Sequence, residues 1–190
     1  MPVNSTTEAL HVLHLSSWYP EGPNSRNGIF IIRQVEALAA QGVTCGLVAS
    51  PLCDTSPPVC IKQEIQGVWH HVNGYTKGQH AMVQAWRQFI AIRQALRGYQ
   101  KERGKPSLMV VHVAWKAGWW ALWLHYRHRI PLVLAEHWSG YLPENKQFKG
   151  FLLRWLTRKL VQKAAFVVCP SAVLAQAMQA HGLQNRYVVI

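Results

Sequence analysis

The chain has 190 residues, of which 49% are hydrophobic, and it carries 20 Lys and Arg against 8 Asp and Glu, a formal net charge of +12. This composition can fill the core of a domain, which excludes a wholly disordered chain, and four cysteines in this length exclude a disulfide scaffold. No run reaches the roughly 18 apolar residues that a membrane span needs.

The positive charge is concentrated in the second part of the chain. Residues 1–76 hold three basic and five acidic residues, whereas residues 77–190 hold seventeen basic and three acidic ones. Such a surface attracts anions, and composition leaves nucleic acid, anionic lipid and phosphorylated small molecules open as partners. The polar segment 1–8 lacks the basic start of a signal peptide and the four cysteines form no disulfide framework, which favours a cytoplasmic protein with reduced thiols. No CxxC pair indicates a zinc site.

The first part of the chain alternates short apolar runs with helical or turn-rich segments. We expect a strand at 10–15, a loop rich in Ser, Pro, Gly and Asn at 16–27, and a helix at 28–41 that ends before Gly42. A second strand is expected at 43–49, a Pro/Ser loop at 50–58, and a hairpin within 59–75 that turns at Gln66-Gly67. The longest helix is expected at 80–103, with one apolar stripe formed by Met82, Trp86, Phe89, Ile92, Leu96 and Tyr99.

The second part continues the alternation, with strands expected at 108–113, 131–135, 165–169 and 187–190, and helices at 116–128, 148–164 and 171–181. Continuous apolar strands separated by helices indicate a doubly wound, mostly parallel, Rossmann-like α/β sheet with helices on both faces. Because ligands of such sheets bind at the carboxyl ends of the strands, we expect function in 16–28, 112–116 and 136–147. The chain ends inside a strand-like run, which favours half of a two-domain enzyme.

The loop 16–28 joins the first strand to the first helix. Gly28 stands where the helix begins, and Asn27 is placed to be its N-cap. Free backbone N–H groups and the helix dipole attract phosphate at such an end, and a glycine lets the anion approach closely. The loop matches neither GxGxxG nor a Walker motif, so a glycine needed only for the turn stays an alternative.

A second candidate site follows the strand 131–135, where Glu136, His137 and Ser139 can reach a substrate. The alternative is that Glu136 orients His137 and both are structural. His112, inside its strand, is more readily explained as a hydrogen-bonded core histidine, with function as the alternative. Ser139 lacks the GxSxG context of a nucleophile, and no histidine has the partners of a metal site, so we expect no metal.

Aromatic residues are concentrated in two segments. Trp115, Trp119, Trp120 and Trp123 are interpreted mainly as core and interface residues, with stacking on bases or sugars as the alternative. Helix 148–164 has a core stripe and a second apolar patch beside basic residues, which suits a membrane surface or a partner domain unless a loop covers it. The expected membrane contacts are Phe148, Phe151, Trp155, Arg154, Arg158 and Lys159.

Three segments, in the right order along the chain, resemble bacterial GT4-type glycosyltransferases, which are retaining enzymes of the two-domain GT-B fold. They are HVLHLSSWYPEGPNSRNGIFIIRQVEALAAQGV, PLVLAEHWSGYLP and AAFVVCPSAVLAQAMQAHGLQNRYVVI. The resemblance implies that residues 1–190 are the N-terminal, acceptor-side domain of such an enzyme. Nothing in the chain matches the acidic Glu-x7-Glu type motif of the family's C-terminal, donor-binding domain, so we expect that domain to lie outside this chain.

The resemblance also implies roles for single residues. His137 matches the histidine near the donor sugar that is important for transfer, and Gly28, preceded by Asn27 where the family has a second glycine, matches the loop near the donor diphosphate. Glu136 stands where the wider family usually has threonine or another residue. The remaining candidates for acceptor contacts or for support of the site are Ser16, Trp18, His112, Glu136, Ser139 and Tyr141.

The expected chemistry is transfer of a sugar from a nucleotide-diphosphate sugar, with no cofactor in this domain, by front-face attack of the acceptor hydroxyl. The positive charge suits an anionic lipid-linked or polysaccharide acceptor of the cell envelope and a peripheral position on the cytoplasmic face of the inner membrane. Two other classes stay open: a basic nucleic-acid-binding α/β module, which lacks the signatures of known modules, and a non-catalytic scaffold domain.

Overall fold

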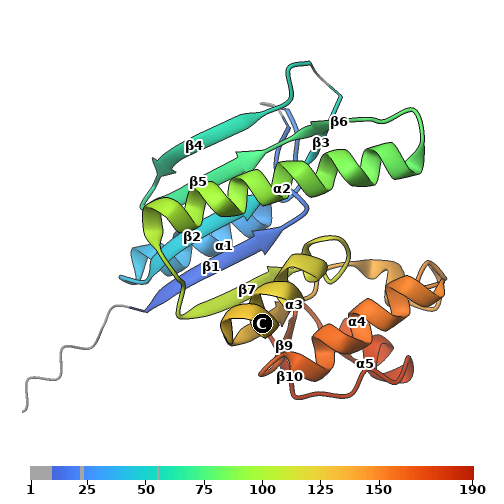
Figure 1. Cartoon of the computed structure of the whole chain (residues 1–190). Coiled ribbons are helices and arrows are strands. Elements are labelled where there is room, and N and C mark those ends of the chain that lie inside the picture. The colour runs from blue at the N-terminus through green and yellow to red at the C-terminus, as the bar shows by residue number, and fades with distance from the viewer. Residues whose placement is uncertain (1–9, 22–23, 55) are drawn as a thin grey trace, which may run out of the picture.

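The computed structural model describes residues 10–21, 24–54 and 56–190. The expected polar start at 1–8 therefore lies outside the described residues, as do two residues of the loop 16–28 and one of the loop 50–58. Within the described part, an eight-stranded sheet runs through the middle of the molecule (Figure 1). Its strands are β1 (His11–Ser16), β2 (Thr44–Ala49), β4 (Cys60–Ile65), β5 (Val68–Asn73), β7 (Leu108–His112), β8 (Leu132–Ala135), β9 (Val167–Cys169) and β10 (Tyr187–Val189).

The sheet has the order β10-β9-β8-β7-β1-β2-β5-β4. Neighbouring strands are parallel except β4 and β5, which form an antiparallel hairpin. The hairpin turns at Gln66 and Gly67, both with positive φ, as the sequence predicts. Along the chain, strands are added on one side of β1 and then, from β7 onward, on its other side. The point where this order reverses lies between β1 and β7, and their carboxyl ends are the expected place for a ligand.

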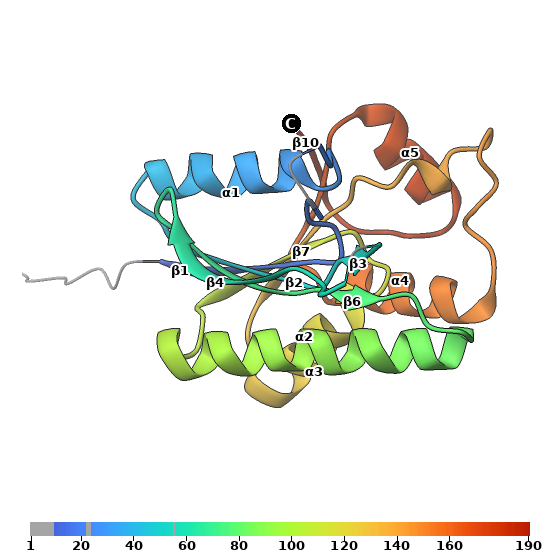
Figure 2. The ribbon, with the colours of Figure 1, turned by 90° about the horizontal axis from the view of Figure 1, so that it is seen from above.

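Helices cover both faces of the sheet, which confirms the doubly wound α/β class (Figure 2). One face carries α1 (Ile29–Ala40) and α5 (Ala172–Ala180). The other carries α2 (Ala81–Arg103), α3 (Ala117–His128) and α4 (Phe151–Lys163). Alternate residues of β1 and β7 point to opposite faces, so Leu13, Leu15 and Val111 enter the main core, while His14 and His112 lie on the α1 side.

Two details of the fold differ from the sequence prediction. The loop 50–58 and the end of the hairpin contribute β3 (Leu52–Cys53) and β6 (Tyr75–Thr76), which form a separate two-stranded sheet. The helix expected at 148–164 begins only at Phe151, because Gly150 precedes it with φ 92°. Phe148 therefore lies outside α4, where it is buried against Tyr141 and His181, so the prediction that it belongs to an exposed apolar face is wrong.

Candidate functional site

Gly28 holds the start of α1 close to the first loop at the carboxyl end of β1. It is buried, has φ 72°, and directly precedes the helix. A Cβ atom on Gly28 would lie 2.7 Å from the carbonyl carbon and oxygen of Trp18, which are backbone atoms that cannot turn away. No described side chain caps the first turn of α1. The Ile29 and Ile31 N–H groups donate to the Arg26 and Gly28 carbonyls at 3.4 and 3.0 Å, which leaves the Phe30 N–H and the positive end of the helix dipole to meet an anion.

Asn27 does not act as the N-cap that the sequence suggests. Gly28 occupies that position, and the exposed Asn27 side chain donates instead to Glu21 Oε1 at 3.5 Å. Its expected contact with a donor diphosphate stays a prediction.

The first loop is fixed by two serine hydroxyls at the end of β1. Ser16, fully buried, donates to the carbonyl of Trp18 at 2.8 Å and accepts from the Trp18 N–H at 2.9 Å. Ser17 accepts from the Ala117 N–H at 3.0 Å and so ties this loop to the start of α3. Ser16 is therefore a supporting residue of the site, and Ser17 is a second one that sequence reasoning missed.

The loop after β7 has an unusual backbone. Val113 and Lys116 both have positive φ, 65° and 66°, which is unfavourable for a residue with a Cβ and especially for a β-branched one. Such strain is common at functional sites. The Val113 N–H donates to the Ala135 carbonyl of β8, and Lys116 Nζ donates to the Tyr75 hydroxyl. Sequence reasoning did not single out these two residues, because nothing in their side chains signals the backbone conformation.

Glu136 joins the loops that follow β7 and β8. Its side chain is fully buried, and each carboxyl oxygen meets two donors at 3.0 Å. Oε1 accepts from the backbone N–H groups of His137 and Trp138, and Oε2 accepts from the Ala114 N–H and the Tyr141 hydroxyl. Burial raises the pKa of this carboxyl, while the four donors act in the opposite direction. Glu136 and Tyr141 thus fix the loops that follow β7 and β8 relative to each other.

A row of three histidines leads from the core to this edge of the sheet. His14 Nδ1 and His112 Nε2 lie 3.0 Å apart, and the His112 and His137 rings are stacked with centroids 5.8 Å apart. Burial lowers the pKa of His14 to about 3 and holds that of His112 well below its usual value. His112 is buried, as expected, but its Nδ1 has no partner among the described residues, so it is only partly hydrogen-bonded.

His137 is the member of the row that reaches the strand ends. It is half-buried, its ring meets the Phe30 ring of α1 edge-on with centroids 4.7 Å apart, and burial lowers its pKa to about 4. It is therefore neutral at neutral pH, so one ring nitrogen can donate a hydrogen bond and the other can accept one. Its Nε2 atom is buried and has no partner among the described residues. A buried nitrogen atom without a hydrogen-bond partner is rare in proteins, and a hydrogen bond to a bound ligand supplies an explanation.

A cavity of about 590 Å³ opens at the same edge, within the range of small-ligand sites. Its walls include Ser17, Trp18, Val113 and Trp138, all from loops that follow strands. Trp18 also meets the Phe30 ring edge-on. Ser139 begins a short 3₁₀ turn, η1 (Ser139–Tyr141), and is exposed there. The structure thus brings Ser16, Trp18, Gly28, His112, Glu136 and His137 to one end of the sheet.

The expected membrane contacts other than Phe148 lie on α4, whose first residue, Phe151, also lines the cavity at the strand ends. Phe151 is 83% exposed, and Trp155, Arg154 and Arg158 are also exposed, whereas Lys159 is half-buried. Of the tryptophans near α3, only Trp120 packs partly against the core, while Trp115, Trp119 and Trp123 are exposed. The part of the interpretation that places these three in the core is wrong, and their role in an interface or in stacking on a ligand stays a prediction. No helix among the described residues has both the length and the apolar character to cross a bilayer.

Comparisons with known proteins agree with this architecture. The sequence model of the family described as "Glycosyl transferase 4-like domain" matches residues 29–190. No curated protein matches the sequence. The structure is similar to sucrose-phosphate synthase from Thermosynechococcus elongatus, with TM-score 0.64, 12% identity, and coverage of 95% of this chain and 47% of that one. For UDP-GlcNAc 2-epimerase from Methanocaldococcus jannaschii the TM-score is 0.48, with 14% identity and coverage of 94% and 44%. The chain thus spans about half the length of the solved structures it matches.

Proposed function

The chain belongs to the glycosyl transferase 4-like domain family, and we propose that it forms the acceptor-side half of an enzyme that transfers a sugar from a nucleotide-diphosphate sugar to an acceptor hydroxyl with retention of configuration. The observation that carries the proposal is the Nε2 atom of His137, which has no partner among the described residues and lies beside the carboxyl ends of β7 and β8. A neutral imidazole there is suited to a hydrogen bond with a sugar hydroxyl of the donor.

The start of α1 is suited to the departing diphosphate. Its first turn offers the Phe30 N–H and the positive end of the helix dipole, and Gly28 adds no side chain that would keep an anion away. In the proposed reaction the acceptor hydroxyl attacks the anomeric carbon on the face that the diphosphate leaves. The bond from that carbon to the diphosphate oxygen breaks, and the acceptor's proton passes to the departing oxygen. Stabilising that oxygen is the main electrostatic task of the site.

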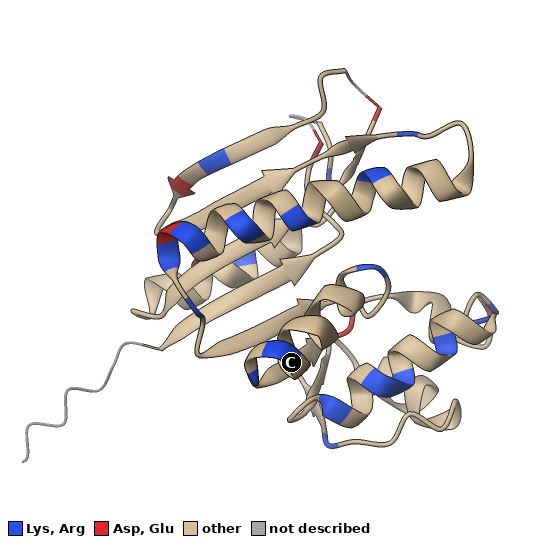
Figure 3. Ribbon diagram, viewed as in Figure 1, with Lys and Arg blue, Asp and Glu red and all other residues tan. Residues whose placement is uncertain are grey.

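A second α/β domain facing this edge of the sheet would complete the enzyme. The chain covers only 47% of the solved structure that it resembles in fold, which leaves room for such a domain as a partner. It would supply most of the contacts to the nucleotide. The acceptor would be lipid-linked or polysaccharide material of the cell envelope, which fits the basic residues on α2 and α4 and a peripheral position on an anionic membrane (Figure 3).

The test is transfer itself. The complete gene product is incubated with radiolabelled UDP-glucose, UDP-N-acetylglucosamine or GDP-mannose and an extract of bacterial membrane lipids. We expect one donor to label the lipid or polysaccharide fraction, and proton NMR of the product to show the donor's anomeric configuration. Inverted configuration would contradict the retaining mechanism, and the absence of transfer from a panel covering the common nucleotide sugars would contradict the proposed activity.

A further inference from the structure

Three neighbouring cavities lie along the face that carries α2, α3 and α4, and each shares lining residues with the next. The cavity at the strand ends, of about 590 Å³, shares three lining residues with a second of about 440 Å³: Trp115, Lys116 and Leu152. The second shares three with a third of about 470 Å³, between α2 and α3: Phe89, Trp119 and Trp120. We call the three cavities together the α2–α3 trough.

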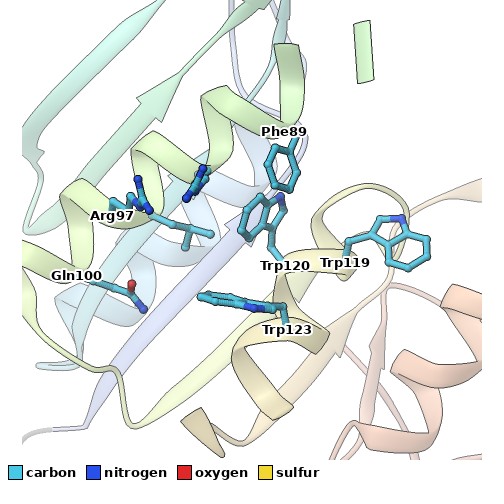
Figure 4. Close-up of a pocket in the computed structure, with 8 residues that line it drawn as sticks. Phe89, Arg97, Gln100, Trp119, Trp120 and Trp123 are labelled. Atoms are coloured by element: carbon cyan, nitrogen blue, oxygen red, sulfur yellow. The ribbon is translucent and has the colours of Figure 1, made fainter. Parts of the chain in front are cut away.

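Aromatic rings form the walls of the trough between α2 and α3 (Figure 4). The centroids of Phe89 and Trp120 lie 4.9 Å apart, and those of Trp120 and Trp123 lie 5.9 Å apart. Yet Phe89 is 42% exposed and Trp123 is 49% exposed. Rings that pack against one another and still face solvent indicate a surface kept apolar for a ligand.

Basic residues stand at both ends of the trough. Lys116 and Lys149 line it at the strand ends, and Arg93 and Arg97 line it at the far end on α2. None of the described residues that line the three cavities is acidic. A ligand that fits has a long apolar part and carries negative charge.

The aliphatic surroundings favour a hydrocarbon chain over stacked nucleic-acid bases. Leu152 is 51% exposed and lines the two cavities nearest the strand ends, and Leu96 lines the third cavity. Bases bind by stacking on rings and gain little from such side chains, whereas a lipid chain gains from every apolar contact.

We propose that the α2–α3 trough binds the single hydrocarbon chain of a lipid phosphate, with the phosphate beside Lys116 and Lys149. A chain held there would place the head group in the cavity at the strand ends, so the trough would present a lipid-linked acceptor to the site from one side. This assignment rests on the proposed function for its biological purpose, but the binding itself does not depend on sugar transfer.

The experiment compares geranylgeranyl monophosphate with isopentenyl monophosphate, which has the same head group and a much shorter chain. Binding to the complete gene product is measured by calorimetry and by the change in tryptophan fluorescence, below the aggregation limit of the long-chain compound and without nucleotide sugar. We expect geranylgeranyl monophosphate to bind at least about 30-fold more tightly than isopentenyl monophosphate. The Phe89→Ala/Trp123→Ala variant should lose most of that advantage, since both side chains line the trough and are exposed enough for the core to be unaffected.

The matched control is Met82→Ala/Tyr126→Ala, on the same two helices. Both residues are more exposed than the pair they match, at 84% and 59%, and neither lines any of the three cavities. We expect this control to keep the wild-type affinity within about twofold. Equal losses of affinity in the two variants would overturn the proposal in favour of general adsorption of the lipid to this face. Equal affinity of the wild-type protein for the two phosphates would overturn it as well. Competition by an oligodeoxythymidine would assign the trough to nucleic acid. A protein that binds the long chain but transfers no sugar would contradict only the proposed function.

Discussion

Replacing Gly28 by alanine tests whether the start of α1 depends on close approach to the first loop. The substitution has two separate costs. A residue with a Cβ at φ 72° costs roughly 1–2 kcal/mol in the left-handed region. The new Cβ would also lie 2.7 Å from backbone atoms of Trp18, and relieving such an overlap costs about 1–3 kcal/mol. We therefore expect Gly28→Ala to lower the free energy of unfolding by about 2–5 kcal/mol.

Gly42, just beyond the other end of α1, provides the matched control. Its φ is 83°, and an added Cβ would meet nothing within 4 Å, so Gly42→Ala carries only the backbone cost. Urea unfolding followed by circular dichroism gives both values, with equal m-values as the sign that the unfolded states are comparable. The difference between the variants should be about 1–3 kcal/mol. Equal losses of stability in the two variants would show that the loop at Trp18 moves aside without cost and that Gly28 is needed only for the turn.

Three further outcomes follow from the structure. Glu136→Ala leaves one buried and two partly buried backbone N–H groups without an acceptor and should lower the free energy of unfolding by about 3 kcal/mol or more. Exposed Glu144→Ala should change it by less than about 0.5 kcal/mol, and similar values for the two would refute the joining role of Glu136. Because the pKa of His14 is about 3 when folded and near 6.5 when unfolded, the unfolded state binds the extra proton, and stability falls as pH drops from about 6.5 toward 4. His14→Leu should make that slope shallower by about 1.3 kcal/mol per pH unit, and an unchanged slope would contradict the burial of a neutral His14. Phe151→Ser/Trp155→Ser should weaken sedimentation with anionic vesicles relative to wild type, and unchanged binding would remove α4 from the proposed membrane contact.

The order of strands and helices follows from the sequence because this fold buries each central strand on both faces. Runs such as 108–111 and 132–135 are apolar throughout, and the segments between them have helical spacing, so a doubly wound sheet is the natural interpretation. The same topology predicts that Gly28 and His137 come to one edge. Their positions in loops after β1 and β8 are enough for that, without any knowledge of side-chain contacts.

Side-chain contacts between neighbouring strands could not be predicted from the sequence. The approach of His14 to His112 depends on the register in which β1 pairs with β7, and a shift by one residue would turn one histidine to the other face. The positive φ of Val113 has no signal in a valine side chain. Such features arise from tertiary context, which periodicity does not contain.

Helical spacing also failed to separate core from surface. The apolar stripe of α2 continues along the whole helix, but only its second part, with Ile92, Leu96 and Tyr99, is buried. Trp86 and Phe89 in the first part remain exposed. A stripe indicates that a face is apolar, and only the structure shows whether the protein itself covers it.

The central claim is that His137 contacts the donor sugar at the carboxyl edge of the sheet, and its most direct test is the rate of transfer by His137→Ala. With a donor that the complete gene product uses, we expect kcat/KM to fall about 100-fold or more, equivalent to about 3 kcal/mol of transition-state stabilisation. His80→Ala, which removes an exposed imidazole at the start of α2, should keep the wild-type value. Urea unfolding of both variants separates a catalytic loss from a folding loss. A His137→Ala enzyme that stays folded and keeps its kcat/KM would contradict the account.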